Sequence, residues 1–592
     1  MEIKDTHTFS NYKDVIIKHS EIDINVDFDR KIISGKVSHL INNKTKVKRL
    51  LLDINGLDIK NVTLGKQEKD TSYNLGKHIS YLGRSLEIKI DLYTKFVHIY
   101  YSTSYNALAL QWLEPRQTSG KIYPFLFTQS ESILARSWIP CQDTPSVRFT
   151  YNAKVKVPKM LMPMMSAENP TEKNDKGIYN FSMKQSIPSY LLALAVGNIV
   201  YRPVDDRTGV YAEPSVIDKA VYEFANIGKM VRTAENLYGP YRWKKFDVLV
   251  LPPGFPFGGM ENPRLTFVTP SIISGDRSLT NVIAHELAHS WSGNLVTNAT
   301  WNDFWLNEGF TVYFERRIME KIEDKSYADM LIYSGLQNLK HTIKELGQDN
   351  PDTMLKLNLE NRDPDKGMTL IAYEKGFFFL LLIEQTVGRK NWDNFLKKYF
   401  NTFSFQSMDT ENFIIFLKNE LLNKNDKWYK NIAVDKWIYE KGLPDNCPKV
   451  KSERFEKVDK NVDKLKQSLS VFELDTKLWT TYEWLHFLYK LPKQLFVNQM
   501  NDLDMAFHFT ESKNKEILCV WLQLAIENKY SKVYDTLEEF LINTGRRKFL
   551  VPLYKSLLKT KQGKLMAKNI YKKARPNYHY VSFSVLDKLL EP

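Results

Sequence analysis

Residues 279–296 read LTNVIAHELAHSWSGNLV, and they contain the stretch that decides the fold, His285-Glu286-Leu287-Ala288-His289. Histidines spaced four residues apart lie on the same face of a helix, one turn from each other. Both imidazoles can then reach one tetrahedral Zn²⁺ ion. Glu286 lies off that face but stays close enough to contact water on the metal. The pattern therefore predicts a zinc site with one ion per chain.

A third protein ligand is expected, because a catalytic zinc site keeps three protein ligands and one open position. Glu308 is predicted to supply it, since it opens the next helical run, NEGFTVYFERR, with eighteen residues between it and His289. Glu286 would then act as general base in metal-assisted hydrolysis. Glu315, one heptad after Glu308, is predicted to support the metal ligands from behind. The alternative is a buried helix with two hydrogen-bonded histidines.

The regions around this motif differ in pattern, and they predict a multidomain α+β protein. Residues 1–203 hold short β-forming runs such as KVSHLI and SLEIKIDL, which favour an antiparallel β domain. Residues 204–446 alternate glycine- and proline-rich loops with long helical runs, which favour a mostly helical catalytic domain. Residues 447–463 are polar and lack periodicity, so we expect a linker. Residues 464–592 are helical throughout, which is typical of a helical-hairpin or solenoid-like domain.

The composition is that of an ordinary globular protein. Of 592 residues, 43% are apolar and 26% are charged, which provides for several large cores. The three cysteines form no CxxC pair, so a reducing compartment and a cytoplasmic location are expected. The N-terminal segment has no apolar run that predicts a signal peptide. The longest apolar run, residues 377–383, is too short to span a bilayer.

The net charge of +14 is concentrated near the C-terminus. Residues 540–592 carry twelve basic side chains against two acidic ones. One interpretation is attraction of nucleic acid or anionic lipid. The favoured interpretation is a solvated, lysine-rich helical face, because no zinc knuckle, RNP-like segment or helix-turn-helix pattern accompanies the charge. No specific nucleic-acid partner is therefore expected.

Five segments carry a resemblance to a known family: IPCQDTPSVRFTY (139–151), PPGFPFGGMENPRLTFVTP (252–270), the zinc segment with its continuation (281–316), AYEKG (372–376) and GRRKF (545–549). In these segments the chain resembles the gluzincin metallo-aminopeptidases of peptidase family M1, and most closely their leukotriene A hydrolase/aminopeptidase branch. The resemblance implies an N-terminal antiparallel β domain, a thermolysin-like zinc catalytic domain and a C-terminal all-α helical-repeat domain.

The loop Gly258-Gly259-Met260-Glu261 is the family's substrate-binding segment. An exopeptidase needs a carboxylate at a fixed distance from zinc to bind the free α-ammonium group, and the resemblance gives this role to Glu261. The two glycines, Gly258 and Gly259, let a substrate backbone approach and pair along the loop. Met260 belongs to the same binding segment.

Three further residues have family counterparts in the active site. Gln129 and Glu131 fall on the strip of the β domain that reaches the zinc, where they would help to hold the ammonium group or the first side chain. The acid at Glu131 is more typical of pure aminopeptidases. Tyr373 matches the family tyrosine that donates a hydrogen bond to the developing oxyanion, a contribution of about 2.7–4 kcal/mol to transition-state stabilisation.

Arg546 and Lys548 match the branch's basic pair for a substrate carboxylate, which suits tripeptides or a fatty-acid carboxylate. The alternative is that both merely belong to the basic C-terminal segment. Asp365 matches an acidic pocket residue used in epoxide opening. Met368 and Phe257 stand where tyrosines are expected, and both make the pocket less polar.

Together these features predict a zinc metallo-aminopeptidase that removes N-terminal residues from di- and tripeptides, working as a monomer. One alternative is hydrolysis of leukotriene-type fatty-acid epoxides in the same site. Alternatives from other classes are a non-enzymatic scaffold and a nucleic-acid-binding protein. The complete set of His285, Glu286, His289 and Glu308 argues against a scaffold.

Overall fold

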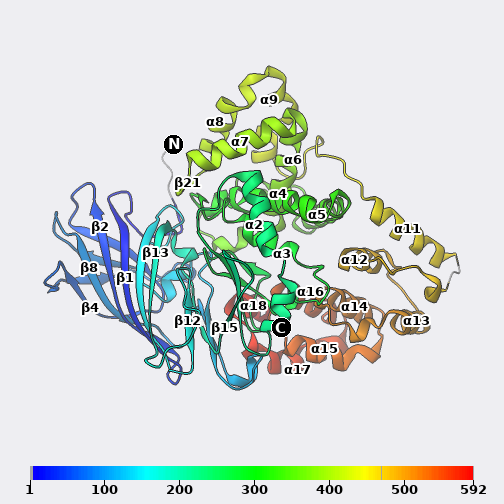
Figure 1. The fold of residues 1–592 in the computed structure, drawn as a ribbon, viewed down its shortest axis with the longest axis horizontal. Helices are drawn as coiled ribbons and strands as arrows, with labels where there is room; N and C mark the ends of the chain where they lie inside the picture. Colours follow the sequence, from blue (N-terminus) through cyan, green and yellow to red (C-terminus); the bar gives the residue numbers. More distant parts are fainter. Residues whose placement is uncertain (1–4, 468–469, 591–592) are drawn as a thin grey trace.

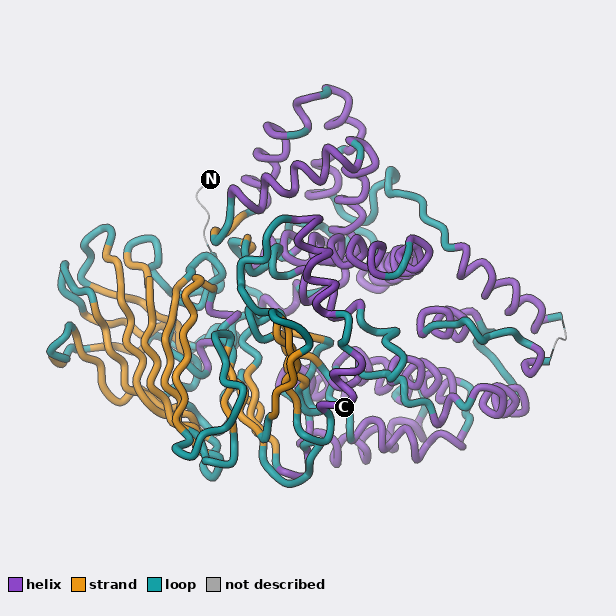
Figure 2. Tube along the Cα trace, viewed as in Figure 1, coloured by secondary structure: helices purple, strands orange, loops and turns teal. Residues whose placement is uncertain are grey.

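The computed structural model describes residues 5–467 and 470–590, which form three parts (Figure 1). Strands of the first 200 residues lie on one side, a mixed body with the central helices lies in the middle, and the last helices lie on the other side (Figure 2). This is the three-part layout that the sequence predicts. Among the described helices, none combines the length and hydrophobicity needed to cross a bilayer.

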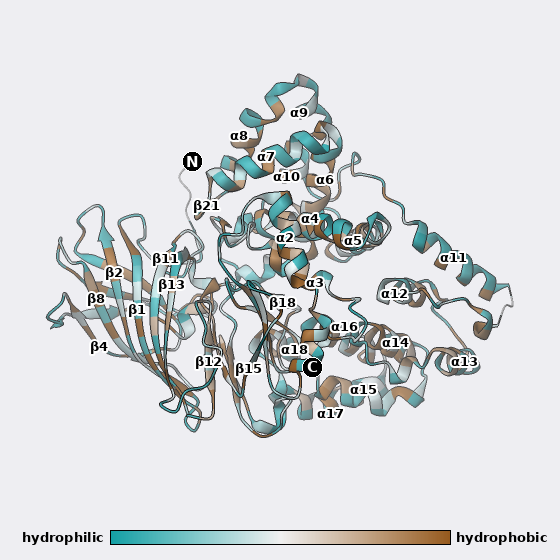
Figure 3. Cartoon of the chain, in the orientation of Figure 1, coloured by the Kyte–Doolittle hydropathy of each residue, from teal (hydrophilic) through white to brown (hydrophobic). Residues whose placement is uncertain are grey.

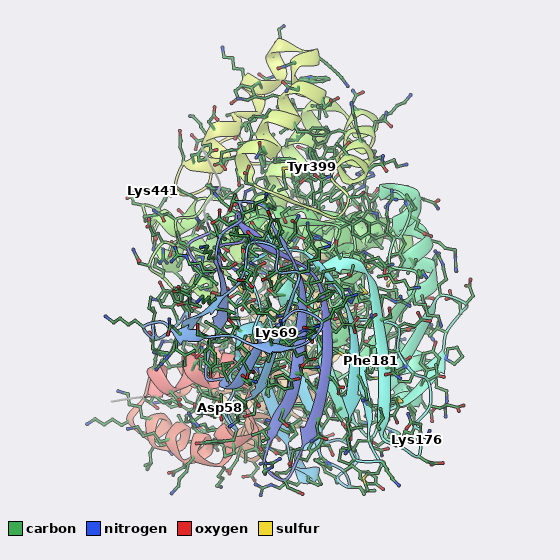
Figure 4. The ribbon with its side chains drawn as sticks, turned by 90° about the vertical axis from the view of Figure 1, so that its left-hand side faces the viewer. Asp58, Lys69, Lys176, Phe181, Tyr399 and Lys441 are labelled. Atoms are coloured by element: carbon green, nitrogen blue, oxygen red, sulfur yellow. The ribbon has the colours of Figure 1, made fainter. Side chains whose placement is uncertain are left out.

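The N-terminal part is built on a seven-stranded sheet with the order β13-β11-β1-β2-β8-β4-β5. Its strands are β1 (Val15–Asp27), β2 (Ile32–Asn43), β4 (Asp58–Leu64), β5 (Lys69–Asp70), β8 (Phe96–Ser102), β11 (Phe149–Lys156) and β13 (Ile178–Ile187). Hydrophobic and hydrophilic residues alternate along them (Figure 3), as expected for a sheet with one buried face. Lys69 and Phe181 mark its two edges in Figure 4.

One pairing departs from the predicted antiparallel pattern. Strand β1 pairs in parallel with β11, with His19 opposite Thr150. Neighbouring antiparallel strands can be joined by a short hairpin, whereas a parallel pair needs a long connection. Here the connection runs through most of the N-terminal part, so sequence patterns around either strand could not reveal the pair.

Two smaller sheets complete the N-terminal part. A three-stranded sheet has the order β3-β7-β6 and a four-stranded sheet the order β12-β14-β10-β9. Their strands are β3 (Arg49–Ile54), β6 (Tyr73–Leu75), β7 (Arg84–Lys89), β9 (Leu110–Leu113), β10 (Phe125–Thr128), β12 (Met162–Met165) and β14 (Leu194–Gly197).

The catalytic part opens with a five-stranded sheet of order β15-β16-β17-β19-β18. Its strands are β15 (Val200–Pro203), β16 (Thr208–Ala212), β17 (Phe246–Val250), β18 (Gly259–Met260) and β19 (Thr266–Val268). The boundary predicted between residues 203 and 204 falls inside the antiparallel β15–β16 pair. We therefore propose that the boundary lies before Val200. The other domain boundaries stay predictions.

Helices dominate the rest of the catalytic part. They are α1 (Ile217–Glu223), α2 (Ile227–Tyr238), α3 (Asn281–Ala288), α4 (Trp305–Ile322), α5 (Lys325–Leu346), α6 (Gly376–Val387), α7 (Arg389–Thr402), α8 (Thr410–Glu420), α9 (Asp426–Ile432) and α10 (Val434–Tyr439). A parallel ribbon of β20 (Val296–Asn298) and β21 (Gln406–Met408) lies beside them. The helical run predicted for residues 279–296 is shorter than expected, because α3 ends at Ala288 and Gly293 turns the chain with a φ of 102°.

The C-terminal part is all helical, as predicted. Its helices are α11 (Glu453–Lys466), α12 (Thr481–Lys490), α13 (Val497–Phe507), α14 (Lys515–Glu527), α15 (Tyr534–Ile542), α16 (Arg547–Leu557), α17 (Lys561–Ala574) and α18 (Tyr580–Leu590). Some basic residues of the segment 540–592 form surface ion pairs, such as Lys559 with Glu527 and Arg575 with Asp587, which fits the solvated-face interpretation. Glu591 of that segment lies outside the described residues.

The predicted linker, residues 447–463, is not an irregular segment. Helix α11 begins at Glu453, and Phe455, Val458 and Val462 on it are buried. Spacings of three, four and seven residues put these side chains on one face, an apolar stripe too sparse to stand out among the charged residues around it. Phe455 joins the core shared by the N-terminal and catalytic parts, whereas the two valines join the separate C-terminal core. The helix therefore ties two cores together.

His39 on β2 makes the fold sensitive to acid. Its ring contacts Ser20 and the Pro140 carbonyl, and burial lowers the pKa of His39 from 6.5 to about 4, with the Pro140 contact opposing. The unfolded chain therefore binds the proton more tightly than the folded one, and stability is lost as pH falls from 6.5 towards 4. From about pH 7 to about pH 5 this one group should cost about 2 kcal/mol.

The substitution His39→Gln retains a donor and an acceptor but removes the titration. We expect its denaturation midpoint in urea to fall less than that of the natural protein when the pH is lowered. His78→Gln, at an exposed position, is the control and should behave like the natural protein. Equal acid sensitivity of His39→Gln and the natural protein would contradict this prediction.

Candidate active site

Helices α3 and α4 bring the predicted zinc ligands together. His285 lies on α3, His289 directly follows it, and Glu308 lies in the first turn of α4. The Oε2 atom of Glu308 is 3.3 Å from Nε2 of His285 and 3.7 Å from Nε2 of His289. One possible ligand atom from each residue lies within 4.8 Å of the others.

This arrangement fits a Zn²⁺ ion. Tetrahedral bonds of 2.0–2.1 Å place neighbouring ligand atoms about 3.4 Å apart, close to the observed separations. Oε2 of Glu308 is buried and has no hydrogen-bond partner among the described residues. A buried carboxylate oxygen without a partner is costly unless a cation satisfies it. The donor set of two imidazoles and one carboxylate is also that of a catalytic zinc site.

The second nitrogen of His285 is held from behind. Its Nδ1 atom is 3.1 Å from Glu315, and Glu315 also accepts a hydrogen bond of 2.9 Å from Asn281. The predicted position of Glu315 behind a metal ligand therefore agrees with the geometry. Asn281 was not predicted, since an asparagine at a helix start is usually assigned to capping.

His289 is held in the same way by residues that the sequence did not single out. Its Nδ1 atom is 2.8 Å from Oδ1 of Asn307 and 3.1 Å from Oγ1 of Thr311, both on α4. These contacts direct Nε2 of each histidine towards Glu308 and fix the ring orientations, as partners behind a metal site generally do. In the sequence, only the position of Asn307 next to the predicted ligand Glu308 could have indicated that it supports the metal site.

Glu286 is buried against the Gly258-Gly259 loop. A Cβ atom on Gly259 would lie 2.3 Å from Oε1 of Glu286, so only glycine leaves room for this carboxylate. Burial raises the pKa of Glu286 well above its ordinary range; His285 opposes the shift, and Glu261 and Glu308 add to it. A carboxylate in such a setting holds a proton more readily than one in water.

Three buried acceptor oxygens without hydrogen-bond partners in the described chain belong to Gln129, Glu131 and Glu261. Glu261 is 4% exposed and its Oε1 is 3.8 Å from Nδ1 of His289, while Gln129 contacts Met260. Burial, with Glu261 and Glu308, raises the pKa of Glu131 well above its ordinary range. The structure thus gathers the predicted ammonium-binding residues beside the zinc site, where their unpaired oxygens favour a cation.

The Glu261 loop is itself anchored. The Glu261 carbonyl accepts a hydrogen bond of 2.8 Å from Nδ2 of Asn294, which lies in the turn after α3. Asn294 was not predicted, because nothing in its local sequence marks it as a partner of a loop 33 residues upstream. It links the turn that follows the metal-binding helix to the substrate-binding loop.

Tyr373 is brought to the zinc site by a close helix crossing. It lies in a π-helical turn, Ile371–Lys375, and its ring stacks on His285 at 6.2 Å. Gly309 packs against Gly376, and a Cβ atom on Gly309 would lie 2.9 Å from the Cα atom of Gly376. Burial and then the nearby Glu308 carboxylate raise the pKa of Tyr373, so its hydroxyl stays protonated and can donate.

Arg546 and Lys548 meet on a buried carboxylate that the sequence did not predict. Nη1 of Arg546 and Nζ of Lys548 lie 3.0 and 2.8 Å from the Glu516 carboxylate on α14. Burial acts to raise the pKa of Glu516, but the two cations outweigh it and hold that pKa below its ordinary range. Arg546 also flanks Gly258, where a Cβ atom would lie 3.0 Å from its Nη2.

Main-chain hydrogen bonds fix this basic pair relative to the substrate-binding loop. The amide of Gly545 donates to the Pro253 carbonyl at 2.8 Å, and the amide of Arg547 donates to the Pro256 carbonyl at 2.9 Å. A Cβ atom on Gly545 would lie 2.4 Å from the Gly254 carbonyl oxygen, so the two segments are in direct backbone contact.

Asp365 lies in a short helix, Pro364–Gly367, and accepts a hydrogen bond of 2.6 Å from Oγ of Ser132. Burial and then Asp363 raise the pKa of Asp365 to about 6. Met368 and Phe257 are partly buried against the main hydrophobic core.

Three family models match the chain in order. Residues 11–191 match the peptidase M1 N-terminal domain, residues 222–437 the peptidase family M1 domain, and residues 479–590 the C-terminal domain of leukotriene A4 hydrolase.

Individual proteins are similar over nearly the whole length. Leukotriene A-4 hydrolase of Xenopus laevis is 37% identical, covering 99% of this chain and 98% of its own. Leucine aminopeptidase 2 of Yarrowia lipolytica is 35% identical, covering 99% and 94%. Among solved structures, yeast LTA4 hydrolase in complex with bestatin superposes with a TM-score of 0.93 at 32% identity, covering 100% and 98%.

These similarities extend through all three parts of the chain, including the helical part that carries Arg546 and Lys548. With the fit of His285, His289 and Glu308 to a metal ion, they lead to one conclusion. The chain belongs to peptidase family M1, in the branch with a leukotriene A4 hydrolase C-terminal domain, and is a zinc metallopeptidase with one catalytic Zn²⁺ ion.

Proposed function

We propose that this enzyme is an aminopeptidase that cleaves the first residue from short peptides, di- and tripeptides above all. The observation that carries the proposal is the buried Oε1 atom of Glu261 beside His289, which has no hydrogen-bond partner among the described residues, with Glu131 and Gln129 next to it. Such a group favours a cation, and the free α-ammonium of a peptide is the cation that an exopeptidase must recognise. The name of the Yarrowia relative, leucine aminopeptidase 2, agrees with this assignment.

The zinc ion would be held by His285, His289 and Glu308. When bound, Zn²⁺ acts as a Lewis acid on the scissile carbonyl and makes a water molecule more acidic. Glu286 accepts the proton of the attacking water and later transfers it to the leaving amine. Its buried setting, which raises its pKa, suits both steps. Tyr373 donates a hydrogen bond to the oxyanion that develops on the carbonyl.

The proposed recognition of the peptide uses both of its ends. Glu261 holds the ammonium group and sets the register so that one residue is removed. Arg546 and Lys548 hold the far carboxylate, and both also pair with Glu516. A substrate carboxylate therefore shares these two cations with Glu516, which limits how much affinity it gains from them.

Hydrolysis of a fatty-acid epoxide is a second candidate, because the Xenopus relative is named leukotriene A-4 hydrolase. Asp365 and its Ser132 partner supply the polar pocket group that this reaction uses. The apolar side chains of Met368 and Phe257 make the pocket less suited to it. The discriminating assay is incubation with a fatty-acid epoxide followed by detection of a diol.

We also propose a reducing, cytoplasmic location, supported by the free thiols of Cys141, Cys447 and Cys519. The monomeric state stays a prediction.

Glu261→Gln tests the ammonium site. The loss of a charge-assisted hydrogen bond worth about 1.5–3 kcal/mol should lower kcat/KM for dipeptides by about 10- to 150-fold. Zinc content, measured by atomic spectroscopy, should stay at one ion per chain. Glu168→Gln, at an exposed position, is the matched control. Normal kcat/KM in Glu261→Gln would rule out this acid as the ammonium anchor.

Glu286→Gln tests the general base. It keeps the size of the side chain but removes its basicity, so kcat should fall by about 10²- to 10⁴-fold. Because Glu286 is not a proposed ligand, zinc content should not change. Activity close to that of the natural enzyme would exclude the proton-transfer role.

Lys548→Met tests recognition of the far carboxylate. Since this ammonium group is exposed, kcat/KM for a free tripeptide should fall by only about two- to fivefold. The C-terminal amide of the same tripeptide should be unaffected, because it has no carboxylate. Lys555→Met, exposed on the same helix, is the control and should change neither. An equal loss on peptide and amide would refute the assignment.

A further inference from the structure

An open cavity of about 750 Å³ lies where the N-terminal sheet meets the β20–β21 ribbon of the catalytic part. Its described lining residues include the basic side chains of Lys18, Lys44 and Arg148, and no described lining residue is acidic. Like charges around one space repel one another, and this repulsion is relieved when an anion enters.

Strand register gathers these cations at one end of the sheet. On β1 and β2, Val15 pairs with Asn43, so Lys44 lies just beyond the paired end. The parallel pairing of β1 with β11 begins at His19 and Thr150. Lys18 comes just before this paired stretch on the β1 side, and Arg148 comes just before it on the β11 side. The cluster therefore follows from the parallel β1–β11 pairing and not from any run of basic residues in the sequence.

Arg148 has no acidic partner among the described residues. Its guanidinium donates to the Ser186 carbonyl at 2.6 Å, to the Asn294 carbonyl at 2.7 Å and to Oγ1 of Thr297. Its Nε atom is buried without a hydrogen-bond partner in the described chain. Burial lowers the pKa of Arg148 to about 10, with Tyr190 opposing, so the group stays charged. A guanidinium that makes only neutral contacts beside a cavity is suited to binding an oxyanion.

Phe405 also lines the cavity, and its backbone is in a strained conformation. Its φ of 59° is in the left-handed region, which bulky residues rarely adopt. The amide of Phe405 donates to the Leu295 carbonyl at 2.7 Å, and its ring packs edge-on against Trp243. The Arg148 guanidinium lies 5.9 Å from the ring centre. Strain of this kind persists only where surrounding contacts fix it, and it is common at binding sites.

Two hydrogen bonds between the N-terminal and catalytic parts involve residues that line the cavity. Oγ of Ser146 donates to the Ala299 carbonyl at 2.7 Å, and Oγ of Ser407 donates to the Pro145 carbonyl at 2.9 Å. The cavity is therefore a built feature of the contact between the N-terminal and catalytic parts. The lining residue Tyr12 has an acidic neighbour, Asp5, which affects the pKa of Tyr12. The Asp5 carboxylate already accepts hydrogen bonds from the His7 amide and from Oγ1 of Thr144.

We propose that this cavity binds a compact multivalent oxyanion, held by Lys18, Lys44 and Arg148. A single residue, Asn294, would connect the Arg148 side of this site to the Glu261 loop. Arg148 binds the Asn294 carbonyl, and the Asn294 side chain in turn binds the carbonyl of Glu261. The site is separate from the zinc centre, and its binding can be measured without any peptidase assay.

The test is isothermal titration calorimetry of the full chain at physiological ionic strength, with inorganic triphosphate and, separately, citrate. We expect saturable binding of one triphosphate per chain. Lys18→Gln/Lys44→Gln should weaken it by about tenfold, because two ionic contacts are lost and both lysines are exposed, where solvent weakens such contacts. Citrate binding alongside triphosphate would assign the site to multivalent oxyanions in general; triphosphate alone would assign it to phosphates.

The matched control is Lys154→Gln/Lys156→Gln, which removes two exposed lysines from β11 of the same sheet, outside the cavity lining. It should bind triphosphate as the natural protein does. Arg148→Lys keeps the charge but not the planar donor geometry and should also weaken binding. The proposal is overturned if neither anion binds at millimolar concentration, or if the control pair weakens binding as much as Lys18→Gln/Lys44→Gln.

Discussion

The close crossing of α4 and α6 at Gly309 and Gly376 is the constraint on which the active site depends. Two backbones can approach this closely only when neither residue carries a Cβ atom. Because Glu308 precedes Gly309 and Tyr373 lies one turn before Gly376, the crossing places a candidate metal ligand and the proposed oxyanion donor side by side. Helix α3 then packs on α4 and adds the two histidines. A bulkier residue at either glycine would separate groups from three helices at once.

Burial of several carboxylates in one place is the electrostatic counterpart of this packing. Glu131, Glu261, Glu286 and Glu308 all lie within one buried region, and burial with mutual repulsion raises the pKa of Glu131 and Glu286. Such a cluster costs free energy until cations enter it. The zinc ion and the ammonium group of the proposed substrate are two cations of different kinds, so the same excess of negative charge would serve both metal retention and recognition of the peptide terminus.

Local spacing made His285 and His289 predictable as a pair, since a helical period fixes which side chains share a face, and Glu286 and Glu308 were predicted from their positions relative to that pair. Tyr373, Glu261 and Arg546 could be assigned only through resemblance to a family, because no local rule connects them to the zinc. Glu516 and Asn294 were missed, since their contacts join chain segments distant in sequence. The short α3, the helix at residues 453–466 and the membership of β15 in the catalytic sheet were also missed, because tertiary contacts override local pattern at element ends.

The backbone hydrogen bonds between Gly545–Arg547 and Pro253–Pro256 bear on the proposed recognition of both ends of the peptide. Flexible side chains on unconnected segments could move to fit peptides of different lengths, and selection by peptide length would then be weak. Here the two segments proposed to bind the ends of the peptide, the loop that leads to Glu261 and the start of α16 at Arg546, are joined through main-chain hydrogen bonds. The separation of these two backbone segments is therefore fixed by main-chain hydrogen bonds, so a change of side chain would alter the groups mounted on them but not the distance between them.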